Sequence, residues 1–413
     1  MKKKKKKKKK KKIRNQFLNH FENDSTFSLF EVIVLILISV VFGVIIGYLL
    51  TYGNSNLRRV RSNSNLGEVV NTYNSIIDNY YDEVDEKKLS DAAIKGMISS
   101  LEDPYSSFLD ESMSGDFNKS VDGEYVGIGI AIYFEEEYNH VSSITKNSPA
   151  SQAGIQEGDI ILSVNEKDCK GLYPNQLYEL ISGSLGGTVT LEVLRGEEKL
   201  SFVMKRDVIE IQSVTGKVFS EEDGKIGYIK IDVISSNSYE QFSKVLKRLE
   251  KKEIDSLILD LRDNPGGQLD QTRKILSMFF PKKTILYRIE KSGSIHKIYS
   301  LNQETRDYPI VVLVNGNTAS SAEVIASCFQ ENYKEVHLVG TKTYGKGNVQ
   351  KSISLRSGSS IKFTVESWLT SKGVQVNGKG ITPDIEEEQD PVYYVEYLEK
   401  DDSQLHKAIS LLK

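Results

Sequence analysis

The spacing of apolar and polar residues changes several times along the chain of 413 residues. An apolar run without a charged residue extends from Val32 to Leu50. From Leu66 to Phe108 apolar residues recur at helical intervals, which predicts two helices that pack into a core. Beyond residue 110 short alternating runs are broken by turn residues, as is typical of a domain of short strands. After about Asp207 strand-like and helix-like stretches alternate, which predicts an α/β core.

Within the α/β core the pattern predicts individual elements. We expect strands at residues 226–231, 256–259 and 310–314, and helices at 239–251 and directly after 320. A late hairpin is expected to begin at Lys346 and to continue in a second strand at residues 361–366. The last residues, rich in acids and tyrosine, are expected to form a terminal helix.

The run from Val32 to Leu50 is a candidate membrane span. Its nineteen residues, rising about 1.5 Å each in a helix, nearly cross a hydrocarbon core of about 30 Å. Lysines fill positions 2–12, so we expect the N-terminus in the cytoplasm and everything after Tyr52 outside. No Ala-x-Ala signal follows the run, which favours a retained, single-pass anchor in membrane lipid. The lysines themselves either contact anionic lipid or are only a low-complexity extension that fixes topology.

Charge and composition exclude some classes of function. The net charge is −3, but residues 1–14 hold eleven Lys and one Arg, and the rest has 42 basic against 57 acidic side chains. This acidic remainder disfavours nucleic-acid binding. Cys169 and Cys328 fall in different predicted units, so no disulfide is expected between them and Cys328 is expected in the core. The histidines lack the spacing of a metal site, and neither a metal nor another cofactor is expected: His20, His140, His296, His337 and His406.

The predicted strand at residues 310–314 enters a helix through small polar residues, among them Ser320 and Ser321. Such a corner holds a hydroxyl clear of its own backbone. The unpaired N–H groups and positive dipole of a helix N-terminus also suit an oxyanion. An ordinary serine cap has the same pattern without chemistry, and on this turn alone that interpretation is favoured.

Lys346 changes this balance because glycines flank it on both sides and let other groups approach closely. A lysine can accept the serine proton only where burial lowers its pKa from about 10.4 towards neutrality. Gln350 follows four residues later. In a strand this spacing puts both side chains on one face, where the amide oxygen can orient the amine.

These residues resemble the C-terminal processing (tail-specific) proteases, a family of serine peptidases with a Ser/Lys dyad and an embedded PDZ domain. The resemblance covers about residues 65–385. The family's Ser-Ala-Ser-Ala-x-Glu turn places the nucleophile on Ser320, and its Phe-Gly-Lys-Gly-x-Val-Gln segment places the base on Lys346 with Gln350 as its partner. Counting back from the lysine selects Ser321 instead. We prefer Ser320, because the glutamate anchors the turn locally; Ser321 then supplies a backbone N–H to the oxyanion.

A second motif precedes the serine turn. Residues 260–267 look like the family's Asp-Leu-Arg-x-Asn-Pro-Gly-Gly element, whose glycine amide helps to build the oxyanion hole. The resemblance assigns this role to Gly266 or Gly267. An ordinary helix-entry turn and a structural ion pair between Arg262 and Asp263 remain alternatives.

A third motif is similar to the centre of a PDZ domain, at residues 148–165. PDZ domains bind a free C-terminus as an added strand and cradle its carboxylate in backbone amides. A β-rich domain with glycine turns is the plainer alternative. The resemblance implies a peptide site at Val126, Gly127, Ile128, Gly129 and Ile130, with the last four forming the cradle.

Pattern and resemblance together predict an α/β and α+β multidomain chain with a transmembrane helix, a helical segment, a β-rich PDZ domain and a crotonase-like α/β protease core. The expected parts are a basic cytoplasmic tail at 1–27, the transmembrane helix at 28–52, the helical region at 53–110, the PDZ domain at 111–205, the protease core at 206–385 and a helical segment at 386–413.

The expected function is that of a membrane-anchored serine endopeptidase, which cleaves extracytoplasmic proteins near C-termini that its PDZ domain has bound. Its partner is a protein or peptide with a free C-terminus, and its helical region is a candidate for homodimerisation. One alternative is an inert, membrane-tethered PDZ receptor for C-termini. Another is a Ser/His/Asp hydrolase with His296 or His337 and Asp260 or Asp263, which leaves the glycine-flanked lysine unexplained.

Overall fold

The computed structural model describes residues 30, 32–46, 64–222, 224–301, 305–393 and 399–413. These residues fall into two compact units, one up to Ser90 and the other from Asp91 onwards.

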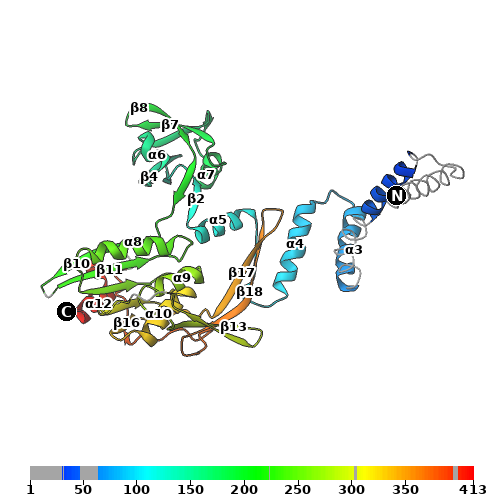
Figure 1. The fold of residues 1–413 in the computed structure, drawn as a ribbon. Coiled ribbons are helices and arrows are strands. Elements are labelled where there is room, and N and C mark those ends of the chain that lie inside the picture. The colour runs from blue at the N-terminus through cyan, green and yellow to red at the C-terminus, as the bar shows by residue number, and fades with distance from the viewer. Residues whose placement is uncertain (1–29, 31, 47–63, 223, 302–304, 394–398) are drawn as a thin grey trace, which may run out of the picture. The chain divides into compact units, whose positions relative to one another are not determined.

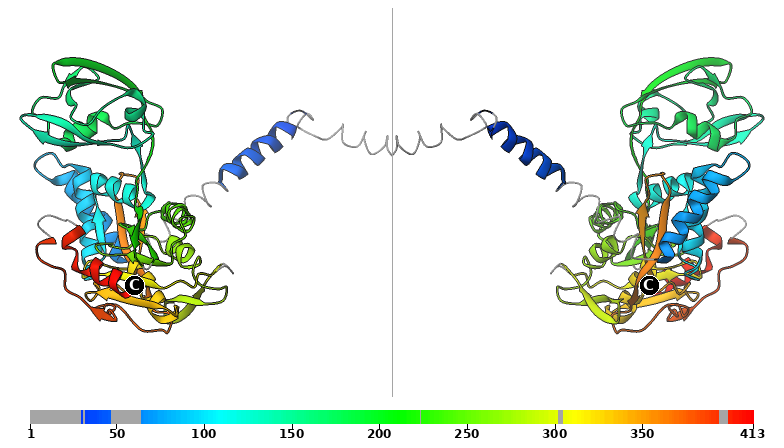
Figure 2. Two further views of the ribbon diagram at one scale, coloured as in Figure 1. Left: turned by 90° about the vertical axis from the view of Figure 1, so that its left-hand side faces the viewer. Right: turned by 90° about the vertical axis from the view of Figure 1, so that its right-hand side faces the viewer.

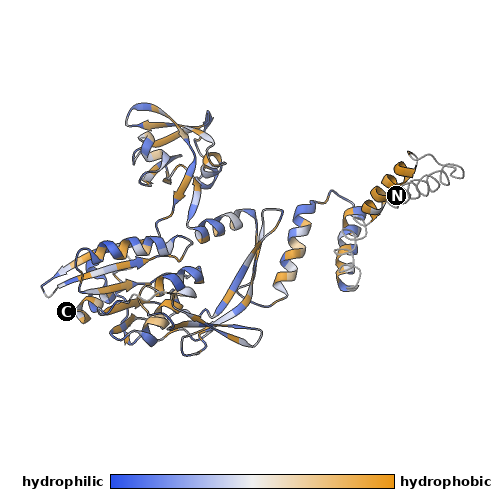
Figure 3. Ribbon diagram, viewed as in Figure 1, coloured by the Kyte–Doolittle hydropathy of each residue, from blue (hydrophilic) through white to orange (hydrophobic). Residues whose placement is uncertain are grey.

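The first unit is helical. Residues 32–46 form a helix that is hydrophobic along its length (Figure 3). Within the described ranges, no helix combines the length and the apolarity that a membrane crossing requires. The last residues of the expected span, 47–50, and the lysine block at 2–12 lie outside the described residues.

The two helices predicted between Leu66 and Phe108 are present as α3 (Ser64–Asn79) and α4 (Glu86–Ser99). Their expected core-packing role is wrong, since no described side chain on either helix is buried. Val69 is 45% exposed and Met97 is 51% exposed. Two helices alone offer too little surface to enclose their own apolar stripes.

The predicted PDZ-like domain has its own sheet, which shares no strand with the sheets of the core (Figure 2). A separate cluster of buried apolar side chains, including Leu177 and Leu191, fills it. The sheet order is β3 (Ile130–Glu135), β4 (Tyr138–Ile144), β5 (Ile160–Val164), β7 (Thr188–Arg195) and β8 (Glu198–Lys205), with β6 (Lys167–Asp168) beside β5 and the helices α6 (Pro149–Ala153) and α7 (Pro174–Ile181).

The core is built on a sheet of six strands (Figure 1). The first pair is antiparallel and the others are parallel. All strands and helices that the pattern predicted for the sheet are present. The order is β10 (Val214–Glu221), β11 (Gly224–Ile231), β12 (Ser256–Asp260), β15 (Ile310–Val314), β16 (Val336–Gly340) and β19 (Ile385–Glu386).

Alternation along the buried strands gives the sheet two apolar faces. Leu257 and Leu259 belong to the large cluster with Cys328, as expected for that cysteine, and with the helices α8 (Ser238–Glu250), α9 (Leu269–Leu276) and α10 (Ser321–Asn332). Ile258, between them, packs with Leu405 of α12 (Ser403–Leu411) on the other face.

A second core sheet carries the late hairpin. It contains β1 (Ser107–Leu109), β18 (Ser360–Leu369), β13 (Ile285–Lys291) and β14 (Ser294–Tyr299), and β17 (Asn348–Ser354) also pairs with β18. The hairpin is confirmed, but β17 begins two residues after Lys346. A register shift between Val349 and Gln350 marks a bulge in this strand.

The helix α5 (Glu111–Asp122) falls in the range predicted for the PDZ domain, but it contacts the core. Its buried Ser114 hydroxyl lies 2.6 Å from the Ser360 hydroxyl of β18. Gly123 ends α5 at φ 72°, where a side chain would lie 2.5 Å from Asn237. The PDZ strands therefore begin only after α5 and β2 (Glu124–Gly127). The strand that follows the last of them, β9 (Asp207–Glu210), pairs with β2 in a short ribbon.

The expected terminal helix is shorter than residues 386–413. The described elements of this segment are the end of β19, a 3₁₀ turn at Glu399–Asp401 and α12, which begins only at Ser403. Asp402 determines this start, because its carboxylate accepts the backbone N–H of Leu405 as an N-cap.

Candidate active site

Ser320 lies at the junction of β15 and α10, in the strand-to-helix corner that the pattern predicted. Its backbone has φ 55° and ψ −122°, a conformation that residues other than glycine rarely adopt. An ordinary N-cap serine has β-region backbone angles, so this turn is not a plain cap. Neighbouring bonds stabilise it: Ala319 donates to Asn264 O and the Thr318 hydroxyl to Leu261 O, both at 2.9 Å.

Accessibility distinguishes the two candidate nucleophiles. Ser320 is half-buried and lines a pocket of about 480 Å³. Ser321 is fully buried in the first turn of α10, and its hydroxyl has no hydrogen-bond partner among the described residues. A substrate can therefore reach the hydroxyl of Ser320 but not that of Ser321.

Glu323 joins the serine turn to the lysine segment, and the sequence had indicated only the first of these contacts. Its fully buried carboxylate accepts the backbone N–H groups of Ser320 and Lys346 on Oε2, each at 2.8 Å. On Oε1 it accepts the N–H of Gly345 at 2.8 Å and the hydroxyl of Thr343 at 2.5 Å. One side chain therefore fixes the backbone on both sides of the candidate dyad.

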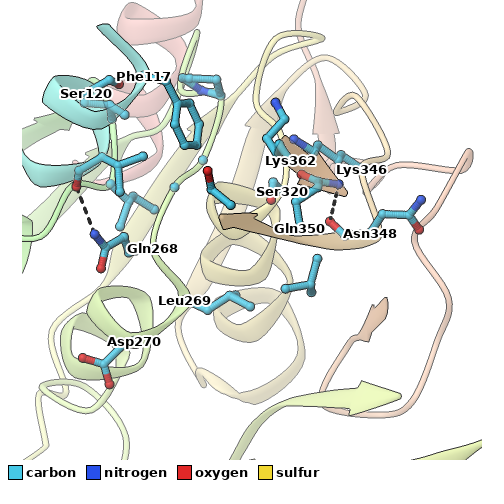
Figure 4. A pocket seen from close by; sticks show the side chains of 18 residues that line it. Phe117, Ser120, Gln268, Leu269, Asp270, Ser320, Lys346, Asn348, Gln350 and Lys362 are labelled. Carbon is cyan, nitrogen blue, oxygen red and sulfur yellow. Dashed lines mark hydrogen bonds between the residues drawn. The ribbon is translucent and has the colours of Figure 1, made fainter. Parts of the chain in front are cut away.

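Lys346 lines the same pocket and is half-buried (Figure 4). Its carbonyl accepts the indole N–H of Trp368 at 2.8 Å, and its Nζ lies 5.5 Å from the centre of the Tyr105 ring. Burial lowers the pKa of Lys346, and the nearby charge of Lys362 lowers it further, against smaller opposite effects of Glu323 and Asp103. A base requires a shift in this direction.

Gln350 reaches the pocket by another route than the one predicted from its spacing. Lys346 precedes the strand, and the bulge at Val349 and Gln350 breaks the regular alternation. Both side chains nevertheless line one pocket. The Gln350 amide donates to Asn348 O at 3.4 Å (Figure 4), and its expected contact with the lysine amine stays a prediction.

The glycine loop after β12 approaches the serine turn directly. Gly266 has φ 94°, and a β-carbon on it would lie 2.8 Å from Ser320 Cβ and 2.9 Å from Ser321 N. Its own N–H is engaged by Asn264 Oδ1 at 2.8 Å. Gly267 forms a β-bridge with Ile234. The two hydrogen bonds of this bridge run from Ile234 N to Gly266 O and from Gln268 N to Ile234 O, so neither uses the Gly267 N–H. This leaves the N–H groups of Gly267 and Ser321, rather than that of Gly266, as candidate oxyanion donors.

The alternative ion pair between Arg262 and Asp263 is wrong. Arg262 is buried and pairs with Asp260 at 2.6 Å and with Asp402 at 2.8 Å. Asp263, at φ 62°, accepts the side-chain amides of Asn315 and Asn317 at 2.9 and 2.8 Å. Arg262 therefore connects the glycine loop to the N-cap of the last helix, and Asp263 connects it to the serine turn.

A Ser/His/Asp arrangement is also contradicted. His296 and His337 are exposed and neither lines the pocket. Asp260 is occupied by Arg262 and by the Tyr228 hydroxyl at 2.7 Å. Among the described residues, no cluster of three or more His, Cys, Asp or Glu side chains could hold a metal ion.

The rest of the pocket offers apolar walls for an extended peptide. Phe117 and Val121 come from α5, Leu269 from α9 and Val349 from β17. Ser320, Lys346, Gln350 and Lys362 are neighbours on one side of the pocket, and Ser120, Gln268 and Asp270 lie on the other (Figure 4). This mixture suits a polypeptide that is held by apolar contacts and cleaved at one point.

The predicted carboxylate cradle lies between β2 and β3. The carbonyl of Ile128 accepts from Ala150 N at 3.0 Å and that of Gly129 from Thr145 N at 2.9 Å. Because the C=O and N–H of a trans peptide point in opposite directions, the N–H groups of Gly129 and Ile130 face away from these donors. Val126 instead lies in β2, paired with Val208.

Comparison with known proteins gives consistent matches along the chain. Residues 225–387 match peptidase family S41, residues 140–195 match the PDZ domain, and residues 51–113 match the N-terminal domain of the activating protease CtpB. In structure, the photosystem II D1 C-terminal processing protease is similar with a TM-score of 0.45 and 24% identity, covering 77% of this chain and 92% of that one.

Two curated relatives, each described as a probable CtpA-like serine protease, are similar over most of the sequence. That of Staphylococcus aureus strain COL is 36% identical over 325 residues, which make up 78% of this chain but only 64% of the relative. That of Staphylococcus epidermidis strain ATCC 12228 is 33% identical over 354 residues, covering 85% of this chain and 71% of the relative. The chain therefore belongs to peptidase family S41, the C-terminal processing proteases with a PDZ domain.

Proposed function

We propose that the protein is a serine endopeptidase in which Ser320 is the nucleophile and Lys346 the general base. The observation that carries this proposal is that both side chains line one pocket while one oxygen of Glu323 holds both backbones. Burial lowers the pKa of Lys346, so that its neutral amine is accessible nearer to physiological pH.

The reaction follows the chemistry of a serine nucleophile. The neutral amine of Lys346 takes the proton of Ser320, and Oγ attacks the scissile carbonyl. The N–H groups of Gly267 and Ser321 stabilise the oxyanion. The ammonium then returns its proton to the leaving amine, which leaves an acyl-enzyme, and a water molecule activated by the same amine hydrolyses it. Gln350 orients the amine.

The substrate is a protein with a free C-terminus that the PDZ domain binds. β3 is an outer strand of its sheet, so it offers an open edge to an added strand. At the start of this edge, the N–H groups of Gly129 and Ile130 receive the carboxylate. Binding the tail in this way brings the preceding chain to the protease core.

The proposed location is the outer side of the cell membrane, with the N-terminus in the cytoplasm. The charge-free run from Val32 to Leu50 supports a single-pass anchor, and its described part exposes apolar side chains such as Ile36 and Val44. Carbonate extraction of membranes and protease accessibility on intact cells test both statements. Release of the full chain by carbonate would contradict the anchor. Resistance of the PDZ domain to a protease added outside intact cells would contradict the outer location.

A homodimer through α3 is also proposed, because this helix exposes Leu66, Val69 and Val70. Sedimentation of the detergent-solubilised chain tests it. Val69→Lys should convert a dimer to a monomer, whereas a monomeric wild type would contradict the proposal.

The experiment for the peptidase uses the full chain in detergent and an unstructured peptide with a free apolar C-terminus. Ser320→Ala and Lys346→Met should each abolish cleavage, while the same peptide with an amidated C-terminus should be cleaved with a raised KM. Cleavage that survives Lys346→Met would overturn the dyad. No cleavage by the wild type, together with retained peptide binding, would leave only a tethered PDZ receptor.

A further inference from the structure

A second lysine, Lys362, faces the pocket beside Lys346 (Figure 4). It lies in β18, where its register partners are Ser352 of β17 on one side and Ser107 of β1 on the other. Opposed residues of an antiparallel pair point to one face, and Ser352 lines the pocket as well. Pairing on both sides therefore fixes the position from which Lys362 reaches the site.

The ammonium of Lys362 has an aromatic but no acidic partner. Its Nζ lies 5.4 Å from the centre of the Phe117 ring, a distance at which the ring face attracts a cation. Within the described parts of the chain, neither Lys362 nor Lys346 forms an ion pair with a carboxylate. The two amines thus share a pocket without a neutralising acid between them.

The charged groups around Lys346 come from several elements, and those other than Lys362 are already engaged. Glu323 of α10 receives four hydrogen bonds, among them that of the Lys346 N–H itself. Asp103, before β1, accepts the hydroxyls of Ser106 and Thr364, each at 2.6 Å. Asp270 of α9 also lines the pocket, but it pairs with Lys274 at 2.7 Å.

Two amines in one half-buried pocket compete for charge, because like charges repel more strongly as water is excluded. Burial is the largest influence that lowers the pKa of Lys346, and the charge of Lys362 is the second. The neutral amine of the proposed mechanism is therefore that of Lys346, which lines the pocket with Ser320.

We propose that Lys362 is a positioning residue for the reaction, whose fixed charge over Phe117 keeps Lys346 in the neutral form that accepts the Ser320 proton. This inference rests on the proposed Ser/Lys mechanism. Lys362 touches neither the scissile bond nor the nucleophile in this role. It acts only through the protonation state of its neighbour.

The first test is the pH dependence of kcat/KM for Lys362→Met in the full-length protein. Without the second charge Lys346 holds its proton to higher pH, so the acid limb of the profile should move to higher pH and kcat/KM at pH 6.5 should fall by roughly threefold or more. At alkaline pH the variant should approach the wild-type rate. Lys362→Arg, which keeps the charge, should restore the wild-type profile.

Lys351→Met is the matched control, because Lys351 lies on the same hairpin but is exposed and outside the pocket. Its profile should equal that of the wild type. Lys362→Gln provides a second neutral variant if the methionine impairs folding, which a thermal melt reveals. An unchanged acid limb in a folded neutral variant would overturn the inference, as would a change in KM alone that appears only with acidic substrates.

The second test does not depend on turnover. Competitive labelling with acetic anhydride across a pH series, analysed by mass spectrometry, measures at which pH the Lys346 amine becomes reactive. In full-length Ser320→Ala protein this midpoint should rise when Lys362→Met is added. If the midpoint stays constant while the wild type cleaves peptide, only this inference fails. If the wild type does not cleave, the proposed function fails, and the labelling still decides whether Lys362 acts on its neighbour.

Discussion

Ser320 and Lys346 donate their backbone N–H groups to the same carboxylate oxygen, Oε2 of Glu323, each at 2.8 Å. The spacing of the proposed nucleophile and base is therefore set by a buried side chain that has no proposed part in the reaction. An amide at this position keeps one oxygen acceptor and turns two donors towards the remaining N–H groups.

Glu323→Gln should consequently reduce kcat by roughly tenfold to a hundredfold, because small misplacements of reacting groups are costly. It should also destabilise the protein by about 1–3 kcal/mol through unsatisfied buried donors. Steady-state kinetics and urea unfolding measure the two effects. Glu331→Gln is the control on the same helix, because its carboxylate binds Ser371 and Lys372 away from the pocket. Equal loss of kcat in both variants would contradict a specific role for Glu323.

The buried hydroxyl of Ser321 provides a prediction of opposite sign for the stability of the protein. It has no partner among the described residues, so Ser321→Ala removes an unsatisfied polar group and keeps the backbone N–H. We expect the free energy of unfolding to stay constant or to rise by up to about 1 kcal/mol. Activity should remain within a few-fold of the wild type. Complete loss of cleavage in a stable Ser321→Ala protein would show that the nucleophile has been assigned to the wrong serine.

Substitution of Gly266, compared with substitution of another glycine of similar φ, distinguishes the cost of steric contact from the cost of backbone strain. In Gly266→Ala the new methyl group would meet Ala319 O at 2.7 Å and Ser320 Cβ at 2.8 Å, at a φ of 94°. Activity should fall sharply and stability by about 1–3 kcal/mol. Gly158→Ala has a similar φ of 88° but open space around it, so it measures the strain alone and should leave cleavage of a non-tail substrate intact. Thermal melts and kinetics on both variants decide the matter.

The ion pair between Arg262 and Asp402 links the glycine loop to the last helix. Asp402→Ala leaves a buried guanidinium with one partner fewer, and we expect a loss of about 3–5 kcal/mol in the free energy of unfolding. Asp402→Asn should lose less, because its oxygen can still accept a hydrogen bond. Chemical unfolding of both variants, with Asp116→Ala on the exposed surface as control, provides the measurement. A loss equal to that of the control would contradict a structural role for the pair.

The same pair predicts acid sensitivity. Burial alone would raise the pKa of Asp402, but hydrogen bonds and charge from Arg262 outweigh it and hold the pKa below the ordinary value of 3.8. The stability from this pair is therefore complete well above pH 3.8, and it is lost as the pH falls from there through the lowered native value. Unfolding curves between pH 5 and pH 2 should converge for wild type and Asp402→Asn towards the acid end. A constant difference over this range would refute the linkage.

The local elements of the core could be predicted from the sequence because their patterns are short-range. The strand at 310–314 is read from five apolar residues, and the helix after Ser320 follows from the turn residues before it. The PDZ strands are marked by glycine turns in the same way. These features depend on neighbours within a few positions, which a single sequence displays directly.

The contacts that shape the site could not be predicted in this way. Lys362 and Lys346 line one pocket because β18 pairs with β17, and Asp402 meets Arg262 across 140 positions of sequence. Lys346 and Gln350 do line one pocket, but not through the regular strand alternation that their spacing predicted, since Lys346 precedes β17 and a bulge changes the facing of the residues after it. Burial of α3 and α4 failed because an apolar stripe predicts a contact but not whether one chain provides it.

Asp402 makes the candidate site depend on the last helix of the described chain. A trimming event that reached this residue would remove the cap of α12 and the second partner of Arg262 together. Arg262 is followed directly by the loop that approaches Ser320, so a chain shortened to this point would lose one of the contacts that hold this loop in place. Loss of Asp402 would therefore weaken the candidate site from a distance of 140 positions along the chain.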